Sequence, residues 1–173
     1  MAERLPQKIA ALALAALFAA GSADAAEKFV PYSEARAQLE QKPGAGAGSV
    51  SPEELEASQR QGTPVRLFDA RTKNEFDREH IAGAVLPYDE AYYRDLELYR
   101  QRVAPNPPDV RSSLERSTRG LLREEVIVTY CSRHCGLSRS LKMQLEKLGF
   151  TNVRWLDGGI DVWREKGYPV EKS

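Results

Sequence analysis

The sequence predicts an α/β fold, in which helices cover both faces of a parallel β-sheet. Short runs of apolar and β-branched residues indicate buried strands at 65–70, 83–86, 126–130 and 153–156. Helical patterns alternate with these runs, at 72–79, 138–148 and 160–166. Strands that alternate with helices favour a parallel sheet that is covered on both sides. The reactive residues of such a sheet are expected at the carboxyl ends of its strands.

Length and composition limit the classes of protein to which this chain can belong. Its 173 residues suit one domain with a substantial core. Lys and Arg together number 25, as do Asp and Glu, so the formal net charge is zero. Because the chain has no basic excess, we expect no nucleic-acid partner.

Residues 1–25 have the pattern of a secretory signal peptide. Arg4 and Lys8 supply positive charge, and an Ala- and Leu-rich run follows them at 9–20. Residues 23–25 (ADA) fit the A-x-A pattern of a cleavage site. The apolar run is short for a bilayer span, although a retained N-terminal anchor is an alternative interpretation. We therefore expect export to a bacterial periplasm, and no membrane attachment of the mature protein.

The remaining chain divides into a linker, a domain and an insertion. Residues 26–49 form an N-terminal extension and linker, which contains the flexible stretch PGAGAG. We expect the domain at 50–171, beginning with a helix that Ser51 caps through a capping box. Residues 88–122 interrupt the domain with two charged helical patterns, which we interpret as an inserted hairpin or lid. Its tyrosines either pack against the domain or serve to cover the active site or dock a partner: Tyr88, Tyr92, Tyr93 and Tyr99.

A cysteine-bearing loop between a predicted strand and a predicted helix carries the main functional signal. Cys131 follows the apolar run 126–130, and the next helix begins near Ser138. A helix N-terminus offers partial positive charge and backbone N–H groups, and nearby cations favour the reactive thiolate. The loop also holds Cys135, the second of the two cysteines in the chain. Cations in and after the loop are Arg133, His134 and Arg139.

Several ordered motifs resemble the rhodanese-like domain family, over residues 50–171 with the 88–122 interruption. They are LFDAR (67–71), EFDREHIAGAV (75–85), VIVTYC (126–131), LEKLGFTNVRWLDGG (145–159), and Trp163 with GYPV (167–170). The resemblance implies a layered domain on a parallel five-stranded sheet. It also implies sulfur transfer through a cysteine persulfide, with a small anionic sulfur donor, a thiol acceptor, and neither a metal nor a cofactor.

The resemblance assigns roles to individual residues. Cys131 is the expected nucleophile, because its thiolate can attack the outer sulfur of a donor and form a persulfide. The residues expected to bind the anionic donor are Ser132, Arg133, His134, Gly136, Ser138 and Arg139. The residues expected to have structural roles near the site are Asp69, Arg71, His80 and Gly158.

The loop differs from the C-x-x-G-x-R pattern that is common in single-domain rhodaneses. Its first glycine, Gly136, comes five residues after Cys131, and Cys135 precedes it. The longer loop resembles a periplasmic two-cysteine subgroup that accompanies quinoprotein-linked catabolism, in which a Trp takes the place of Gly136. The related cysteine phosphatases need C-x₅-R, and Leu137 occupies the position of that arginine.

The second cysteine leaves several functions open. Cys135 could form a disulfide with Cys131, attack a persulfide and release sulfide, bind a metal, or take no part. Besides sulfur transfer, the chain could therefore be a thiol–disulfide redox protein, or a soft-metal carrier that also uses His134. A non-catalytic rhodanese fold that binds a partner is a further alternative. In each case the 88–122 insertion could dock a periplasmic protein.

Overall fold

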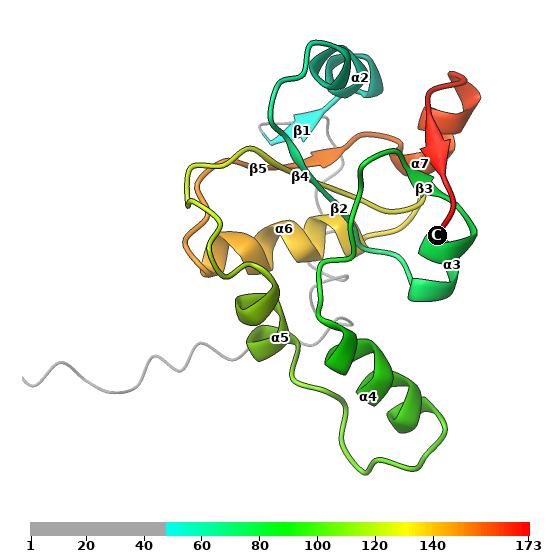
Figure 1. Ribbon diagram of the computed structural model, residues 1–173, viewed down its shortest axis with the longest axis vertical. Coiled ribbons are helices and arrows are strands. Elements are labelled where there is room, and N and C mark those ends of the chain that lie inside the picture. Colours follow the sequence, from blue (N-terminus) through cyan, green and yellow to red (C-terminus); the bar gives the residue numbers. More distant parts are fainter. Residues whose placement is uncertain (1–47) are drawn as a thin grey trace, which may run out of the picture.

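The computed structural model describes residues 48–173 (Figure 1). The predicted leader at 1–25 and the linker up to residue 47 lie outside the described residues. The strands are β1 Ser49–Val50, β2 Arg66–Asp69, β3 His80–Ile81, β4 Ile127–Tyr130, β5 Val153–Leu156 and β6 Val170–Glu171. The helices are α2 Pro52–Arg60, α3 Lys73–Arg78, α4 Glu90–Arg100, α5 Val110–Ser117, α6 Leu137–Lys147 and α7 Gly159–Glu165.

The main sheet is parallel and has the strand order β1-β5-β4-β2. The prediction of five strands is wrong, because the segment 83–86 makes only an isolated bridge between Val85 and Phe68. Val85 donates its N–H to Leu67 O (2.9 Å) and accepts the N–H of Asp69 (3.0 Å). Pro87 follows two residues later and has no N–H to extend the ladder. The fifth position is therefore occupied, but by a single residue.

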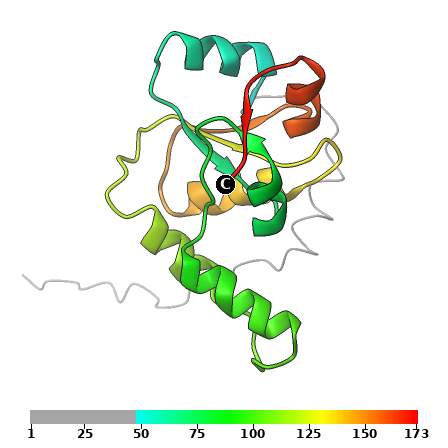
Figure 2. The same cartoon turned by 45° about the vertical axis from the view of Figure 1, so that its right-hand side comes forward.

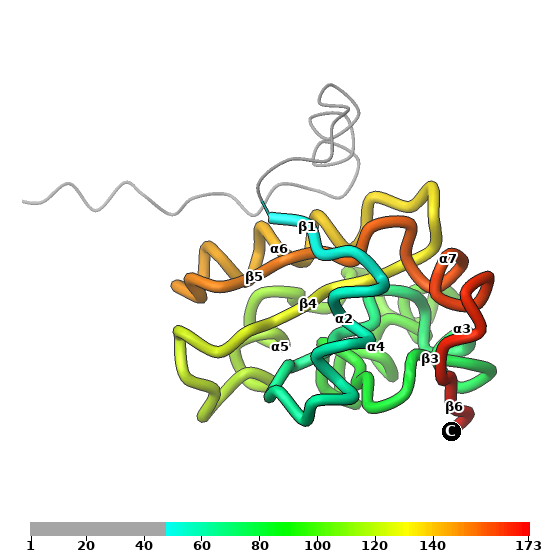
Figure 3. The backbone as a smooth tube through the Cα atoms, turned by 90° about the horizontal axis from the view of Figure 1, so that it is seen from above, coloured from blue at the N-terminus to red at the C-terminus, as the bar shows by residue number. Residues whose placement is uncertain are grey.

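A second, two-stranded sheet closes the domain near its C-terminus. β3 pairs antiparallel with β6, so that His80 lies opposite Glu171 (Figure 3). The two strands are far apart in the sequence and only two residues long, and no periodic pattern marks them. The Trp163 indole N–H donates to Pro169 O (2.9 Å), which holds the chain leading into β6 against α7.

Helices cover both faces of the main sheet, as the sequence predicts. One face carries a core built with α2, α3 and α7, in which Leu67, Val128 and Trp163 are buried. The other face packs on α5 and α6, around Phe68 and Ile127. Neighbouring residues of β2 and β4 point to opposite faces, because successive side chains of a strand alternate.

Local capping explains where several helices begin. Ser51 accepts the N–H of Glu54, and the Glu54 carboxylate accepts the N–H of Ser51, which confirms the predicted capping box. Thr72 and Glu75 form the same arrangement before α3. Each pair satisfies backbone N–H groups that the first helical turn leaves without partners.

The 88–122 segment contributes α4 and α5. Figure 2 shows α4 projecting from one end of the domain, beyond the helices that cover the sheet. No residue of α4 is buried, whereas α5 places Leu114 in the core. None of the helices within residues 48–173 has the length and apolarity that crossing a membrane requires.

Candidate functional site

The cysteine loop leaves the carboxyl end of β4 and returns to the start of α6. The N–H of Cys135 donates to Ser132 O (3.1 Å), which forms a turn over residues 132–135. Gly136 then precedes the first residue of α6. The Thr129 hydroxyl donates to Ser138 O (2.8 Å) and so ties the strand to the first turn of the helix. The loop therefore folds back on itself and places both cysteines at the carboxyl edge of the sheet.

Oxygen atoms surround the sulfur of Cys131. Its Sγ lies 2.9 Å from Cys135 O and 3.4 Å from Ser132 O, and 3.3 Å from the Ser138 hydroxyl. The residue is 1% exposed. A hydrogen bond to the Cys135 side chain and burial both raise the pKa of the Cys131 thiol. In this arrangement Cys131 is a thiol that donates its proton.

Cys135 has the opposite environment. A hydrogen bond from the Cys131 thiol lowers the pKa of Cys135 to about 6, against the effect of burial. The N–H of Leu137, at the start of α6, also donates to Cys135 Sγ (3.4 Å). Cys135 is partly exposed, and both cysteines are free thiols. The helix N-terminus thus favours a thiolate on Cys135, rather than on Cys131 as the sequence suggests.

The turn before α7 supports the back of the loop. Ile160 donates its N–H to Cys131 O (3.0 Å). Gly159 has a φ of +58°, and a Cβ on it would lie 2.0 Å from Cys131 O. Gly158, a predicted site residue, has a φ of +69° and approaches Val162 in the same way. A side chain at Gly159 would therefore push the loop away from α7, whereas one at Gly158 would collide with Val162 within α7.

Within residues 48–173, the predicted arginines of the site contact other parts of the domain and not the cysteine sulfurs. Arg133 pairs with Glu165 of α7, and its backbone N–H donates to Asp161 (2.8 Å). The Arg139 guanidinium lies over the Trp155 ring, 5.2 Å from its centroid. His134 is exposed. Binding of an anionic donor by these cations therefore stays a prediction.

No three side chains of the His, Cys, Asp or Glu type gather as a metal site within residues 48–173. His134 consequently does not join the two cysteines in a three-ligand cluster.

Asp69 and Arg71 form a buried ion pair below the site. The guanidinium donates to both carboxylate oxygens (2.6 to 3.1 Å) and to Glu79 O (2.6 Å). It also lies over the Tyr130 ring, 5.7 Å from the centroid. Tyr130 immediately precedes Cys131, and its hydroxyl accepts the N–H of Ile81 (3.1 Å). These contacts link the end of β2 to the strand that carries the loop.

His80 lies in β3 and contacts α3. Its Nδ1 is 2.9 Å from Phe76 O, and its ring stacks on the Phe76 ring with a centroid separation of 3.9 Å. Its Nε2 lies 3.7 Å from Glu171. The structure therefore places His80 between α3 and β6.

The sequence predicts that Gly158 and Gly159 form a tight turn near the loop, but two other residues that position the loop were missed. Thr129 lies within an apolar strand, where a buried hydroxyl needs a partner. Asp161, which accepts the Arg133 N–H, has no local signal, because its partner is 28 residues away in the sequence.

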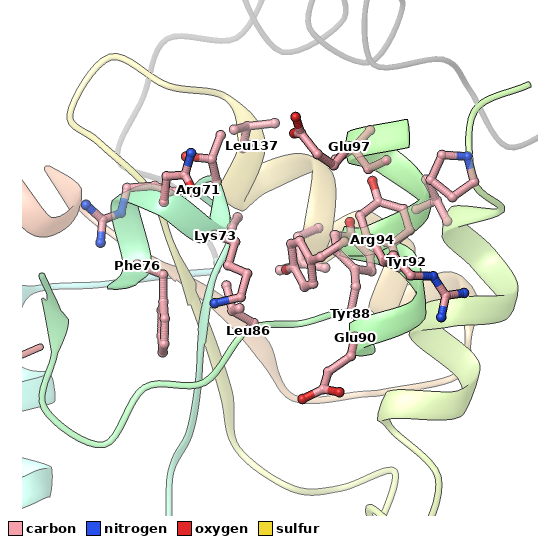
Figure 4. Close-up of a pocket in the computed structure, with 18 of the residues that line it drawn as sticks. Arg71, Lys73, Phe76, Leu86, Tyr88, Glu90, Tyr92, Arg94, Glu97 and Leu137 are labelled. Atoms are coloured by element: carbon pink, nitrogen blue, oxygen red, sulfur yellow. The ribbon is translucent and has the colours of Figure 1, made fainter. Parts of the chain in front are cut away.

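A cleft of about 1460 Å³ separates α4 from α3 and α6. Figure 4 shows Tyr88 and Tyr92 on one side of it, facing Lys73 and Leu86 on the other. Leu137, two residues after Cys135, lines the cleft, whereas neither cysteine does. Tyr93 Oη and Gln144 Oε1, from two other lining residues, are buried with no hydrogen-bond partner in the part of the chain described here.

The model of the Rhodanese-like domain family matches residues 51–166. The chain belongs to this family. The match covers β4, the cysteine loop, the turn before α7 and the α4–α5 segment alike.

Solved structures share the fold. The BH2092 protein from Bacillus halodurans superposes with a TM-score of 0.55 at 22% identity, over 83% of this chain and 87% of that one. A thiosulfate sulfurtransferase from Pseudomonas aeruginosa superposes with a TM-score of 0.50 at 20% identity. That alignment covers 73% of this chain but only 20% of the larger enzyme. At these identities the similarity shows the fold alone.

One curated relative is the tRNA uridine(34) hydroxylase of Bacillus pumilus, which is 34% identical over 113 residues. The alignment covers 64% of this chain and 29% of the relative. The chain thus spans less than a third of that protein.

Proposed function

We propose that this protein is a sulfurtransferase that carries sulfane sulfur as a persulfide on Cys131. The position of Cys131, at the carboxyl end of β4 and directly before a loop that ends at a helix N-terminus, carries the proposal. A helix N-terminus stabilises negative charge, which a persulfide anion bears. Membership of the rhodanese-like family and a fold shared with a thiosulfate sulfurtransferase support the same reaction class.

The reaction begins with loss of the proton of the Cys131 thiol. The Cys131 thiolate then attacks the outer sulfur of thiosulfate, the sulfur–sulfur bond of the donor breaks, and sulfite leaves with its electron pair. The product is a Cys131 persulfide. A thiol acceptor attacks the outer sulfur of that persulfide and regenerates Cys131.

Intact-mass measurement tests this assignment. Reduced protein is incubated anaerobically with thiosulfate, and the mass of the chain and the released sulfite are measured. We expect Cys135→Ser to gain one sulfur atom and Cys131→Ser to gain none. If Cys131→Ser gains the sulfur instead, Cys131 is not the carrier. If no form of the protein gains sulfur or releases sulfite, the proposed sulfur transfer is overturned.

We also propose that the protein acts after export to the periplasm. The pattern of residues 1–25 supports this, with cleavage expected after Ala25. N-terminal sequencing of the protein recovered from a periplasmic fraction tests it. A mature chain that begins at Ala26 is expected, whereas an intact N-terminus in the cytoplasmic fraction would contradict export.

A further inference from the structure

The two cysteine sulfurs lie in one loop in different states. Cys131 is buried and donates a hydrogen bond, whereas Cys135 is partly exposed and accepts the N–H of Leu137. The 132–135 turn brings Cys135 back over Cys131, so that Cys131 Sγ lies 2.9 Å from the carbonyl oxygen of Cys135. Each cysteine shifts the pKa of the other, upward for Cys131 and downward for Cys135. Once Cys131 carries a persulfide, the Cys135 thiolate lies beside a sulfur–sulfur bond, and a thiolate and such a bond are the reactants of thiol–disulfide exchange.

We propose that Cys135 is a second catalytic thiol, which attacks the sulfur-loaded Cys131 and releases hydrosulfide. The inference rests on the proposed persulfide at Cys131. The Cys135 thiolate attacks Cys131 Sγ, a bond forms between the two Sγ atoms, and the bond from Cys131 Sγ to the outer sulfur breaks. The outer sulfur takes up a proton from solvent and leaves as HS⁻ with the electron pair of the broken bond.

The electron balance identifies what the reaction consumes. The sulfane sulfur is reduced to sulfide, and the two cysteines are oxidised to a disulfide. A further cycle therefore needs an external dithiol, which reduces the Cys131–Cys135 disulfide by exchange. The protein would then be a sulfane reductase as well as a sulfur carrier, with a protein or small-molecule dithiol as its second substrate.

Three features of the loop favour attack by Cys135 over a passive role. The N–H of Leu137 stabilises its thiolate at the helix N-terminus. Its partial exposure lets its own proton pass to solvent, which leaves the thiolate. The back of Cys131 is held by Ile160 and Gly159, so the loop can bring Cys135 toward a stationary partner.

A single-turnover experiment on the full chain tests the inference. Reduced wild-type protein receives about one equivalent of thiosulfate without oxygen or added thiol, and sulfide and intact mass are followed. We expect sulfide release, loss of the mass of two hydrogens, and a Cys131–Cys135 disulfide in the peptide map. Cys135→Ser is expected to keep the added sulfur and to release sulfide at least about tenfold more slowly. A donor-free sample controls for oxidation by other agents.

The outcomes separate this inference from the proposed function. If the wild-type protein gains a stable sulfur atom and releases no sulfide, the proposed sulfur transfer holds but the proposed role of Cys135 is overturned. A wild-type protein that gains no sulfur and forms no disulfide removes the proposed function and this inference together. Sulfide release from Cys135→Ser at the wild-type rate would also overturn the proposed role of Cys135.

Oxidation with diamide tests loop closure without any sulfur donor. We expect reduced wild-type protein to form the intramolecular Cys131–Cys135 disulfide, which a dithiol reverses. Failure to form it, in protein that still accepts sulfur on Cys131, would show that the loop cannot bring the two sulfurs together.

Discussion

The cysteine loop at 131–136 and the α4–α5 segment are attached to the same sheet in different ways. Backbone groups hold the loop, through the contacts of Cys131 O with Ile160 and of the Arg133 N–H with Asp161. The α4 helix buries no residue, and Leu98 and Tyr99 on it are 37% and 40% exposed. The hydrogen bonds of the loop fix it against α7, and chemistry at a sulfur atom requires such a fixed position. A helix such as α4, which has no buried residue, has low local stability.

The support of the loop extends to the buried Asp69–Arg71 pair, which gives the largest expected effect. Asp69 is fully buried, so Asp69→Ala leaves the Arg71 guanidinium without its counter-charge. We expect a loss of about 3–5 kcal/mol in the free energy of unfolding, measured by urea denaturation. The matched control is Asp77→Ala, which breaks an exposed pair with Lys73 and should cost about 0.5 kcal/mol or less. Equal losses would show that the buried pair does not anchor the site.

Gly159 tests the attachment of the loop directly. Gly159→Ala combines a positive φ with a Cβ that would lie 2.0 Å from Cys131 O. We expect a loss of about 3 kcal/mol and slower loading of sulfur, measured by urea denaturation and by intact mass. Gly167→Ala is the control, because its φ is +70° but its Cβ would meet nothing within 4 Å. It should lose only about 1 kcal/mol and load sulfur normally. A similar result for both glycines would remove the argument for a tight fit behind Cys131.

Tyr93, beside the cleft, tests the looser region. Its hydroxyl is buried and has no partner within residues 48–173, so Tyr93→Phe removes a polar group that loses its hydration on folding. We expect the free energy of unfolding to rise by about 1 kcal/mol, measured by urea denaturation. Tyr99→Phe, at an exposed position of α4, should change it by less than about 0.5 kcal/mol. Destabilisation by Tyr93→Phe would show that the hydroxyl has a partner in solution.

The two regions also differ in how far the sequence predicts them. Strands β2, β4 and β5 are marked by apolar runs, and the Ser51 capping box marks the start of α2, because these signals are local. The helices of the 88–122 segment are likewise predicted, but not their placement across a cleft, because few apolar residues of α4 specify a partner surface. Pairing of β3 with β6 depends on contacts distant in the sequence and has no periodic signal.

The cysteine loop shows where local reasoning stops. Its strand, its cysteines and the helix that follows are all evident in the sequence. Which sulfur receives the Leu137 N–H depends on the 132–135 turn, since that turn directs Cys135 toward the helix and Cys131 toward carbonyl oxygens. The spacing of the two cysteines alone does not determine which of them the turn directs toward the helix.

The smallest expected effect concerns Asp89, which caps α4 and binds α5. Its carboxylate accepts the N–H of Tyr92, the Ser113 hydroxyl (2.8 Å) and the Arg116 guanidinium (2.6 Å). These contacts, and the hydrogen bond from Arg116 above all, lower the pKa of Asp89 from 3.8 to about 2. Because the pKa is lower in the folded state, this stabilisation is present above about pH 4 and is lost as the pH falls toward 2.

Asp89→Asn keeps a good helix-capping residue and removes the charge. We expect a loss of about 0.5–1 kcal/mol in the free energy of unfolding near neutral pH, and a smaller difference from wild type as the pH falls below about 4. Urea denaturation across this pH range measures both. Asp109→Asn is the control, because Asp109 caps α5 mainly through Ser112 and forms no recorded ion pair within the described residues. A pH-independent loss for Asp89→Asn would mean that the cap, and not the bond to Arg116, joins the two helices.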